Sequence, residues 1–179
     1  MDDWFVAQVE QHGADIHAYL SRRTMDGVAD DLLADVWLAA YAGRSGFDPD
    51  LGSARAWLFG VARHVLHGHY RRNRLRTTIA RALRLERPTD ETAAIDARLD
   101  AAALGEQLRT ALRELPAVER ELLLLVAWEN LSPTEAAQVL GIPAGTARSR
   151  LHRARHRMDE RLSGSPQTQD EPTQQEADR

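Results

Sequence analysis

The chain has 179 residues, of which 43% are apolar and 28% charged, and a formal net charge of −4. This length allows one or two small domains and excludes a large enzyme core, and no apolar run is long enough to cross a membrane. The absence of cysteine excludes disulfides, thiolate metal sites and cysteine nucleophiles. The first residues, MDDWFVAQVEQHG, lack the basic and apolar segments of an export signal, so we expect a cytoplasmic protein without membrane insertion.

Charge is strongly segregated along the chain. Residues 1–52 carry −7 and residues 88–135 carry −6, whereas residues 53–87 carry +8 and residues 136–162 carry +4. Blocks of this size predict two surfaces for a polyanion and acidic surfaces for a different partner, although a charge run can also simply solvate a helix face.

The apolar pattern is helical almost throughout, and no alternating run typical of a strand is present. In the N-terminal half we expect helices at about residues 4–23, 28–41 and 54–75. A turn at Met25-Asp26-Gly27 separates the first two, and the loop GRSGFDPDLGS precedes the third.

In the C-terminal half, one helix is expected before Leu115-Pro116 and another over residues 117–129, which include the apolar run LLLLVAW. Ser132-Pro133-Thr134-Glu135 predicts a capping box with proline at the first helical position. That helix should end near Gly141, and a last helix should begin at Pro143 or Ala144. The fold class is therefore all-α, with two small helical domains at residues 1–85 and 104–162, a flexible linker at 86–103 and a disordered tail at 163–179.

The last helix has an arginine-rich face. Five arginines lie between Arg148 and Arg157 without a carboxylate among them. At about 100° per residue, an apolar seam forms on one side, whereas Ser149 and His152 lie opposite and Arg148 and Arg153 lie on the shoulders. The seam consists of Ala147, Leu151, Ala154 and Met158. With the capped helix and the tight turn before it, this pattern is typical of a helix-turn-helix; the alternative is a surface helix whose arginines only aid solubility.

The segment ENLSPTEAAQVLGIPAGTARSRLHRARHRM resembles region 4 of bacterial RNA polymerase sigma factors of the sigma-70 family, in the extracytoplasmic-function (ECF) subfamily. ADDLLADVWLAAY resembles region 2.2, and FDPDLGSARAWLFGVARHVLHGHYRRNR resembles regions 2.3 and 2.4. The resemblance covers about residues 4–76 and 104–162.

For region 4, the resemblance implies reading of the minus-35 promoter element. Arg148, Ser149, His152 and Arg153 match the positions that read bases or line the groove. Arg150, Arg155 and Arg157 are expected to contact phosphates, and Thr146 to hydrogen-bond phosphate at the helix start. Asn130 stands where many relatives have glycine, and asparagine tolerates the left-handed backbone that a helix end requires.

For region 2, the resemblance implies recognition and melting of the minus-10 element. The loop at residues 43–53 should capture a flipped base, and the arginines of the basic block should neutralise phosphates. The loop candidates are Phe47, Asp48 and Asp50, and the arginines are Arg55, Arg63, Arg71, Arg72, Arg74 and Arg76. Trp57 aligns with Val61 and His64, which favours a core position over a stacking platform, and Phe59 stays open between the two.

The resemblance also implies partners. Region 2.2 should bind the β′ clamp helices of core RNA polymerase, through Asp30, Asp31, Leu32, Asp35 and Leu38. The alternative for the three aspartates is solvation or capping of their helix. The helix at residues 117–129 should help to hold the β flap, although its apolar run is equally consistent with core. Promoter DNA and an anti-sigma factor are the other expected partners.

No catalytic residue, cofactor or metal is expected. His64 and His67 share a helix face, but His69 points elsewhere and no third ligand is evident. The sequence contains no phosphate-cradling glycine motif and no pairing of a nucleophile with a base. The alternative function is a stand-alone helix-turn-helix regulator that does not depend on polymerase.

Overall fold

The structure is a computed structural model that describes residues 3–25, 27–82 and 105–163, with side chains up to residue 76 in the first half. The predicted linker at residues 86–103, almost all of the predicted tail and Asp26 of the predicted turn lie outside this part. Every regular element in the described ranges is helical, as predicted. The elements are α1 (Asp3–Ser21), α2 (Val28–Gly43), the short 3-10 helix η1 (Arg44–Gly46), α3 (Ala54–Ala82), α5 (Glu106–Glu114), α6 (Ala117–Ala127), α7 (Pro133–Leu140) and α8 (Ala144–Ser163).

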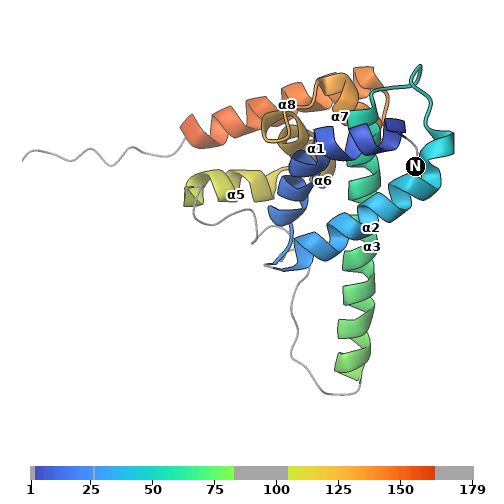
Figure 1. Ribbon diagram of the computed structural model, residues 1–179. Helices are drawn as coiled ribbons and strands as arrows, with labels where there is room; N and C mark the ends of the chain where they lie inside the picture. Colours follow the sequence, from blue (N-terminus) through green and yellow to red (C-terminus); the bar gives the residue numbers. More distant parts are fainter. Residues whose placement is uncertain (1–2, 26, 83–104, 164–179) are drawn as a thin grey trace, which may run out of the picture.

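Helices α1, α2 and α3 pack against one another and form the N-terminal unit (Figure 1). Ile16, Leu20 and Val36 are fully buried between them, and Tyr19 meets Phe59 edge to face with ring centroids 5.5 Å apart. The structure therefore assigns Phe59, which the sequence left open, to the core. The Ser53 hydroxyl accepts a hydrogen bond from the Ala56 amide at the start of α3.

Helix α3 continues to Ala82, beyond the predicted end near residue 75. No glycine or proline occurs between Gly68 and Pro88, so no strong helix breaker stops it there. Conversely, α6 ends at Ala127, two residues earlier than predicted, and the chain turns through Asn130 at a φ of +52°. The left-handed backbone expected at Asn130 is confirmed.

Helices α5 to α8 form the C-terminal unit. The predicted capping box is present, with the Ser132 hydroxyl accepting from the Glu135 amide and the Glu135 carboxylate accepting from the Ser132 amide. Gly141 ends α7 at a φ of +65°, and α8 begins at Ala144. The four seam residues Ala147, Leu151, Ala154 and Met158 are all buried, as the helical wheel predicts.

The two units pack directly on each other, a contact that the prediction of two domains joined by a flexible linker does not include. Helix α7 lies against α3, and a single cluster of buried side chains runs from Ile16 and Phe59 to Leu122, Leu125 and Ala136 (Figure 1). Leu122 and Leu125, from the apolar run of α6, thus contribute to a core that the units share. This packing brings charged groups of one unit against those of the other.

Candidate nucleic-acid interface

Helix α8 presents a cationic face to solvent because its buried seam fixes the rotation of the helix. Arg148, Ser149, His152 and Arg155 are exposed, and Arg150 is half-buried beside the seam. Thr146 is half-buried in the first turn, where its carbonyl accepts a hydrogen bond from the Ser149 hydroxyl. These side chains therefore share one side of the C-terminal unit in an arrangement that can enter a DNA groove.

Two further arginines of this face meet at a single carboxylate. Arg153 Nε donates to Glu119 Oε1 at 3.4 Å, and Arg157 Nη1 donates to Glu119 Oε2 at 2.5 Å. The Glu119 side chain, in the first turn of α6, is only 8% exposed. Arg153 and Arg157 are predicted to have different tasks. Glu119 is not predicted, because its separation of 34 residues from Arg153 leaves no local signal in the sequence.

A second group of arginines follows helix α3. Arg71, Arg72, Arg74 and Arg76 are exposed, on the stretch of α3 that projects away from the C-terminal unit (Figure 1). Several exposed guanidinium groups on a projecting helix can neutralise phosphates of a nucleic acid.

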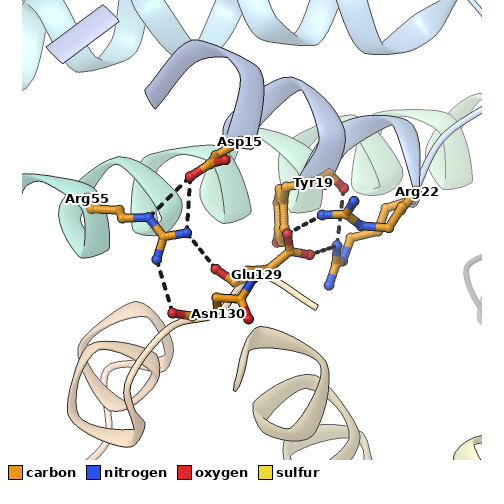
Figure 2. Close-up of polar contacts among 7 residues, drawn as sticks. Asp15, Tyr19, Arg22, Arg55, Glu129 and Asn130 are labelled. Carbon is orange, nitrogen blue, oxygen red and sulfur yellow. Dashed lines mark hydrogen bonds and ion pairs between the residues drawn. The ribbon is translucent and has the colours of Figure 1, made fainter. Parts of the chain in front are cut away.

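Arg55 and Arg63, in contrast, are engaged with neighbouring groups. Arg55 Nη2 donates to Asp15 Oδ2 at 3.1 Å and to the Glu129 carbonyl at 2.5 Å, and Arg55 Nη1 reaches the Asn130 carbonyl (Figure 2). Arg63 Nε donates to Glu121 Oε1 at 2.7 Å. In the described arrangement, both side chains serve the contact between the units.

The loop between α2 and α3 lines a cavity of about 470 Å³. Phe47 stacks on Trp4 at 5.2 Å between ring centroids and lies 5.4 Å from Trp57. Asp48 and Asp50 are exposed, and the Asp48 carboxylate accepts a hydrogen bond from the Asp50 amide at 2.9 Å. An aromatic wall beside polar groups can hold a flat, unstacked base.

Trp57 combines the core position that its helical spacing favours with a place in the cavity lining. It is half-buried and packs against the core, and it also lines the cavity. Gln138 of α7 closes one side, and its Nε2 donates to the Leu51 carbonyl at 2.6 Å. Neither Trp4 nor Gln138 is predicted from the sequence, because Trp4 reaches Phe47, and Gln138 reaches the cavity, only through tertiary packing.

Helix α2 presents the acidic surface. Asp30, Asp31 and Asp35 are exposed, and Leu38 is 71% exposed. Leu32 is a correction to the predicted set: it is only 2% exposed and belongs to the core, because it lies on the side of α2 that faces α1 and α3. On this surface, therefore, Leu38 is accessible to solvent and Leu32 is not.

One carboxyl at the contact between the units, that of Glu135, has a perturbed pKa. Partial burial raises the pKa of Glu135, but hydrogen bonds from the Ser132 amide and the Ser53 and Ser132 hydroxyls outweigh it, so the pKa lies below its usual value. The Ser53 hydroxyl, in the N-terminal unit, donates to Glu135 Oε1 at 2.8 Å.

Within the described ranges, no three histidine, aspartate or glutamate side chains form a group that could hold a metal, and no helix is long and apolar enough to cross a membrane.

Comparison with known proteins assigns both cationic faces to one family. Residues 8–76 match the family described as sigma-70 region 2, and residues 105–158 match the family described as sigma-70, region 4. The chain is 37% identical over 152 residues to the ECF RNA polymerase sigma factor SigF of Caulobacter vibrioides, covering 84% of this chain and 80% of that protein. It is 36% identical over 153 residues to the probable RNA polymerase sigma-C factor of Mycobacterium bovis, covering 84% of this chain and 77% of the relative.

The chain belongs to the ECF group of the sigma-70 family.

A solved structure agrees with this assignment. CnrH, in complex with the cytosolic domain of CnrY, superposes on this sigma factor with a TM-score of 0.61 at 27% identity, covering 93% of this chain and 92% of CnrH. The protein is thus a transcription initiation factor, and its N-terminal and C-terminal units are hereafter called region 2 and region 4. The region 2 match ends at Arg76 and the region 4 match at Met158, so each match contains one of the two cationic faces.

Proposed function

We propose that this sigma factor, bound to core RNA polymerase, reads a minus-35 element with α8 and captures the minus-10 element with α3 and the cavity. The observation that carries the proposal is the burial of the α8 seam, because it leaves the arginine-rich face of a helix-turn-helix outward. The protein itself performs no chemistry in this proposal and acts in the cytoplasm.

In region 4, base reading falls to Arg148, Ser149, His152 and Arg153, which share the outward side of α8. Arginine can bond the O6 and N7 atoms of guanine in a bidentate manner, and serine can bond either base of a pair. Phosphates flanking the groove would be bound by Thr146, Arg150, Arg155 and Arg157.

In region 2, an unpaired base would enter the cavity beside Phe47, with Asp48 in its lining and Asp50 exposed next to it in the same loop. Extruding a base from the stack costs a few kcal/mol, and stacking on an aromatic ring returns about 1–3 kcal/mol. Arg71, Arg72, Arg74 and Arg76 would hold the adjacent phosphates, with Arg55 and Arg63 added once they leave region 4.

The described arrangement cannot read both elements at once. The minus-35 and minus-10 elements lie about 25 base pairs apart along the promoter, or ~85 Å at ~3.4 Å per base pair. A packed body of this chain length has a radius of gyration of only about 16 Å. Since Arg63 is also bound to Glu121 of region 4, we infer that the regions separate before the promoter is engaged.

Polymerase would bind the acidic side of α2 through its β′ clamp helices, with Asp30, Asp31 and Asp35 guiding the encounter and Leu38 providing apolar contact. Its β flap would bind region 4. An anti-sigma factor is a further proposed partner, because a second solved structure that superposes on this chain is the sigma factor RpoE in complex with the anti-sigma factor NepR from Bartonella quintana.

Run-off transcription on a library of random promoters, with a bacterial core polymerase, tests the proposal. The full chain should add start sites that share two upstream elements. In the same assay, Asp31→Arg together with Leu38→Arg should abolish the new start sites, whereas Glu10→Arg on the exposed side of α1 should not. Sequence-specific DNA binding without any dependence on core polymerase would instead support the stand-alone regulator.

A further inference from the structure

Glu119 is a carboxylate buried beneath the DNA-facing helix of region 4. It lies in the first turn of α6, whose Leu122 and Leu125 are anchored in the core. Each of its two oxygens accepts from a different arginine of α8, Oε1 from Arg153 and Oε2 from Arg157. Glu119 is therefore a fixed point from which two side chains of the recognition face extend.

The two arginines differ in the atoms that remain available. Arg153 uses Nε toward Glu119, and its Nη groups form no hydrogen bond with the described residues, although its side chain is 53% exposed. The two Nη groups suit the O6 and N7 acceptors of guanine. Arg157 uses Nη1, so Nε and Nη2 stay free to contact a phosphate.

A carboxylate at this place is unfavourable for general DNA affinity. It cancels part of the positive charge of α8 by pairing with two of its arginines, so less of that charge is left to attract phosphates. Its compensating effect would be orientation, because a long side chain held in advance loses less conformational freedom when it binds. Glu119 is a buried carboxylate that restrains the half-exposed side chain of Arg153, so it is suited to orient that side chain before DNA binds.

We infer that Glu119 is a positioning residue for promoter specificity: it aims the Nη groups of Arg153 at a base edge and restrains Arg157. The inference rests on the proposed reading of the minus-35 element by α8. Glu119 lowers the affinity for DNA in general and raises the discrimination between base pairs. Its removal should therefore raise general affinity and lower discrimination. A carboxylate that only fastens α6 to α8 would not do this, since its loss would weaken binding to every DNA.

The test uses the full-length protein and two duplexes. The first carries the minus-35 sequence selected by the wild type from a random library, and the second differs at the base pair where Arg153→Ala relaxes the preference. Binding of both duplexes is measured over a range of salt concentrations for Glu119→Gln, Arg153→Ala and the double variant. Glu106→Gln is the matched control, because Glu106 is also a first-turn glutamate, paired with Arg109 at 2.5 Å, but lies on α5.

We expect Glu119→Gln to lower the preference for the selected base pair about tenfold and to strengthen binding to the second duplex. The salt dependence should become steeper by about one phosphate contact, because the released arginines can meet any phosphate. The double variant should discriminate no worse than Arg153→Ala alone, since both changes remove the same contact. Glu106→Gln should leave all three quantities unchanged.

Two results would overturn the inference in distinguishable ways. If Arg153→Ala loses the preference but Glu119→Gln keeps it, Glu119 has no positioning role and the proposed function stands. If Arg153→Ala changes no preference at any base pair, the proposed role of Arg153 falls, and the role of Glu119 falls with it.

A second variant covers the case in which Glu119→Gln does not fold. Glu119→Asp keeps the buried charge but withdraws it by one methylene from the Arg153 contact, which is already 3.4 Å long. It should lower the preference while the melting temperature stays close to that of the wild type. Unchanged preference in a folded Glu119→Asp protein with the Arg153 effect intact would refute the positioning role.

Discussion

Arg23 of region 2 donates a hydrogen bond to the carboxylate of Glu129 in region 4, with Nη1 and Oε1 2.9 Å apart although the residues are 106 positions apart in the chain. The Glu129 side chain is only 1% exposed, and Arg22 bonds its other oxygen. Figure 2 shows Tyr19 of α1, and Arg22 just after the end of α1, facing Glu129, with Arg55 on the other side of the same segment. This cluster joins region 2 and region 4 in the arrangement described above, in which the two regions pack on each other.

The same cluster also carries a cost. Arg22 Nε and Arg23 Nη2 are buried without a hydrogen-bond partner among the described residues, and each such donor opposes burial by about 1–3 kcal/mol. An interface with both strong pairs and unsatisfied donors is suited to opening when another partner offers better contacts.

Glu129→Gln should shift the sigma factor toward an open arrangement. Removing one member of a buried ion pair costs about 3–5 kcal/mol, and separation of the regions relieves that cost by returning both arginines to water. Because the chain has no cysteine, dyes can be placed at two introduced cysteines, in place of the exposed Ala7 and Gln107. Energy transfer between them should fall in Glu129→Gln and stay at the wild-type value in Glu10→Gln, whose site is exposed. Equal transfer in both variants would show that Glu129 does not hold the regions together.

Glu121→Gln should strengthen binding of a single-stranded minus-10 oligonucleotide to the free protein. Arg63 Nε is 2.7 Å from the Glu121 carboxylate, and release of a half-exposed pair of this kind corresponds to about 1 kcal/mol, or about fivefold. Fluorescence anisotropy at several salt concentrations measures the change. The gain should disappear when Arg63→Ala is added, and a gain that persists without Arg63 would contradict the assignment of that arginine to DNA.

Arg153→Ala and Arg157→Ala should differ in holoenzyme binding to minus-35 variants. Arg153→Ala should cost about 1–3 kcal/mol at the selected sequence and relax preference at one base pair. Arg157→Ala should weaken all sequences alike and lower the salt slope by about 0.9, the value for one phosphate. Competition binding with a panel of single-base variants separates the two patterns. Identical profiles would show that Arg153 and Arg157 do not have the separate roles of base reading and phosphate contact.

His12 predicts a pH dependence of stability. Burial lowers its pKa below the ordinary 6.5, and the charge of Arg55 lowers it further, against an opposing effect of Asp15. The unfolded chain then binds a proton more readily than the folded one. The stability associated with neutral His12 is thus complete above pH 6.5 and is lost as the pH falls from 6.5 toward the lowered pKa.

Urea unfolding at pH values from 5 to 7.5 measures this effect. His12→Gln should have a flatter pH profile than the wild type in that window, whereas His152→Gln, at an exposed site on α8, should follow the wild type. Parallel profiles for His12→Gln and the wild type would exclude the contribution of His12.

The sequence alone predicts the local features of this sigma factor. The capping box at Ser132, the left-handed Asn130 and the buried seam beginning at Ala147 all appear as predicted, because helical periodicity and end signals operate over about four residues. The same periodicity turns Arg148 and His152 outward on α8.

Tertiary packing alone decides which groups meet. Nothing near Glu119 or Glu129 indicates their arginine partners, which lie 34 to 107 residues away. Trp4 joins Phe47 and Trp57 in the same way, through the packing of α1 on the loop side of α3. A helix face tells which side chains turn inward or outward, but the partner of a buried charge depends on which other helix arrives there, and that is a property of the whole folded chain.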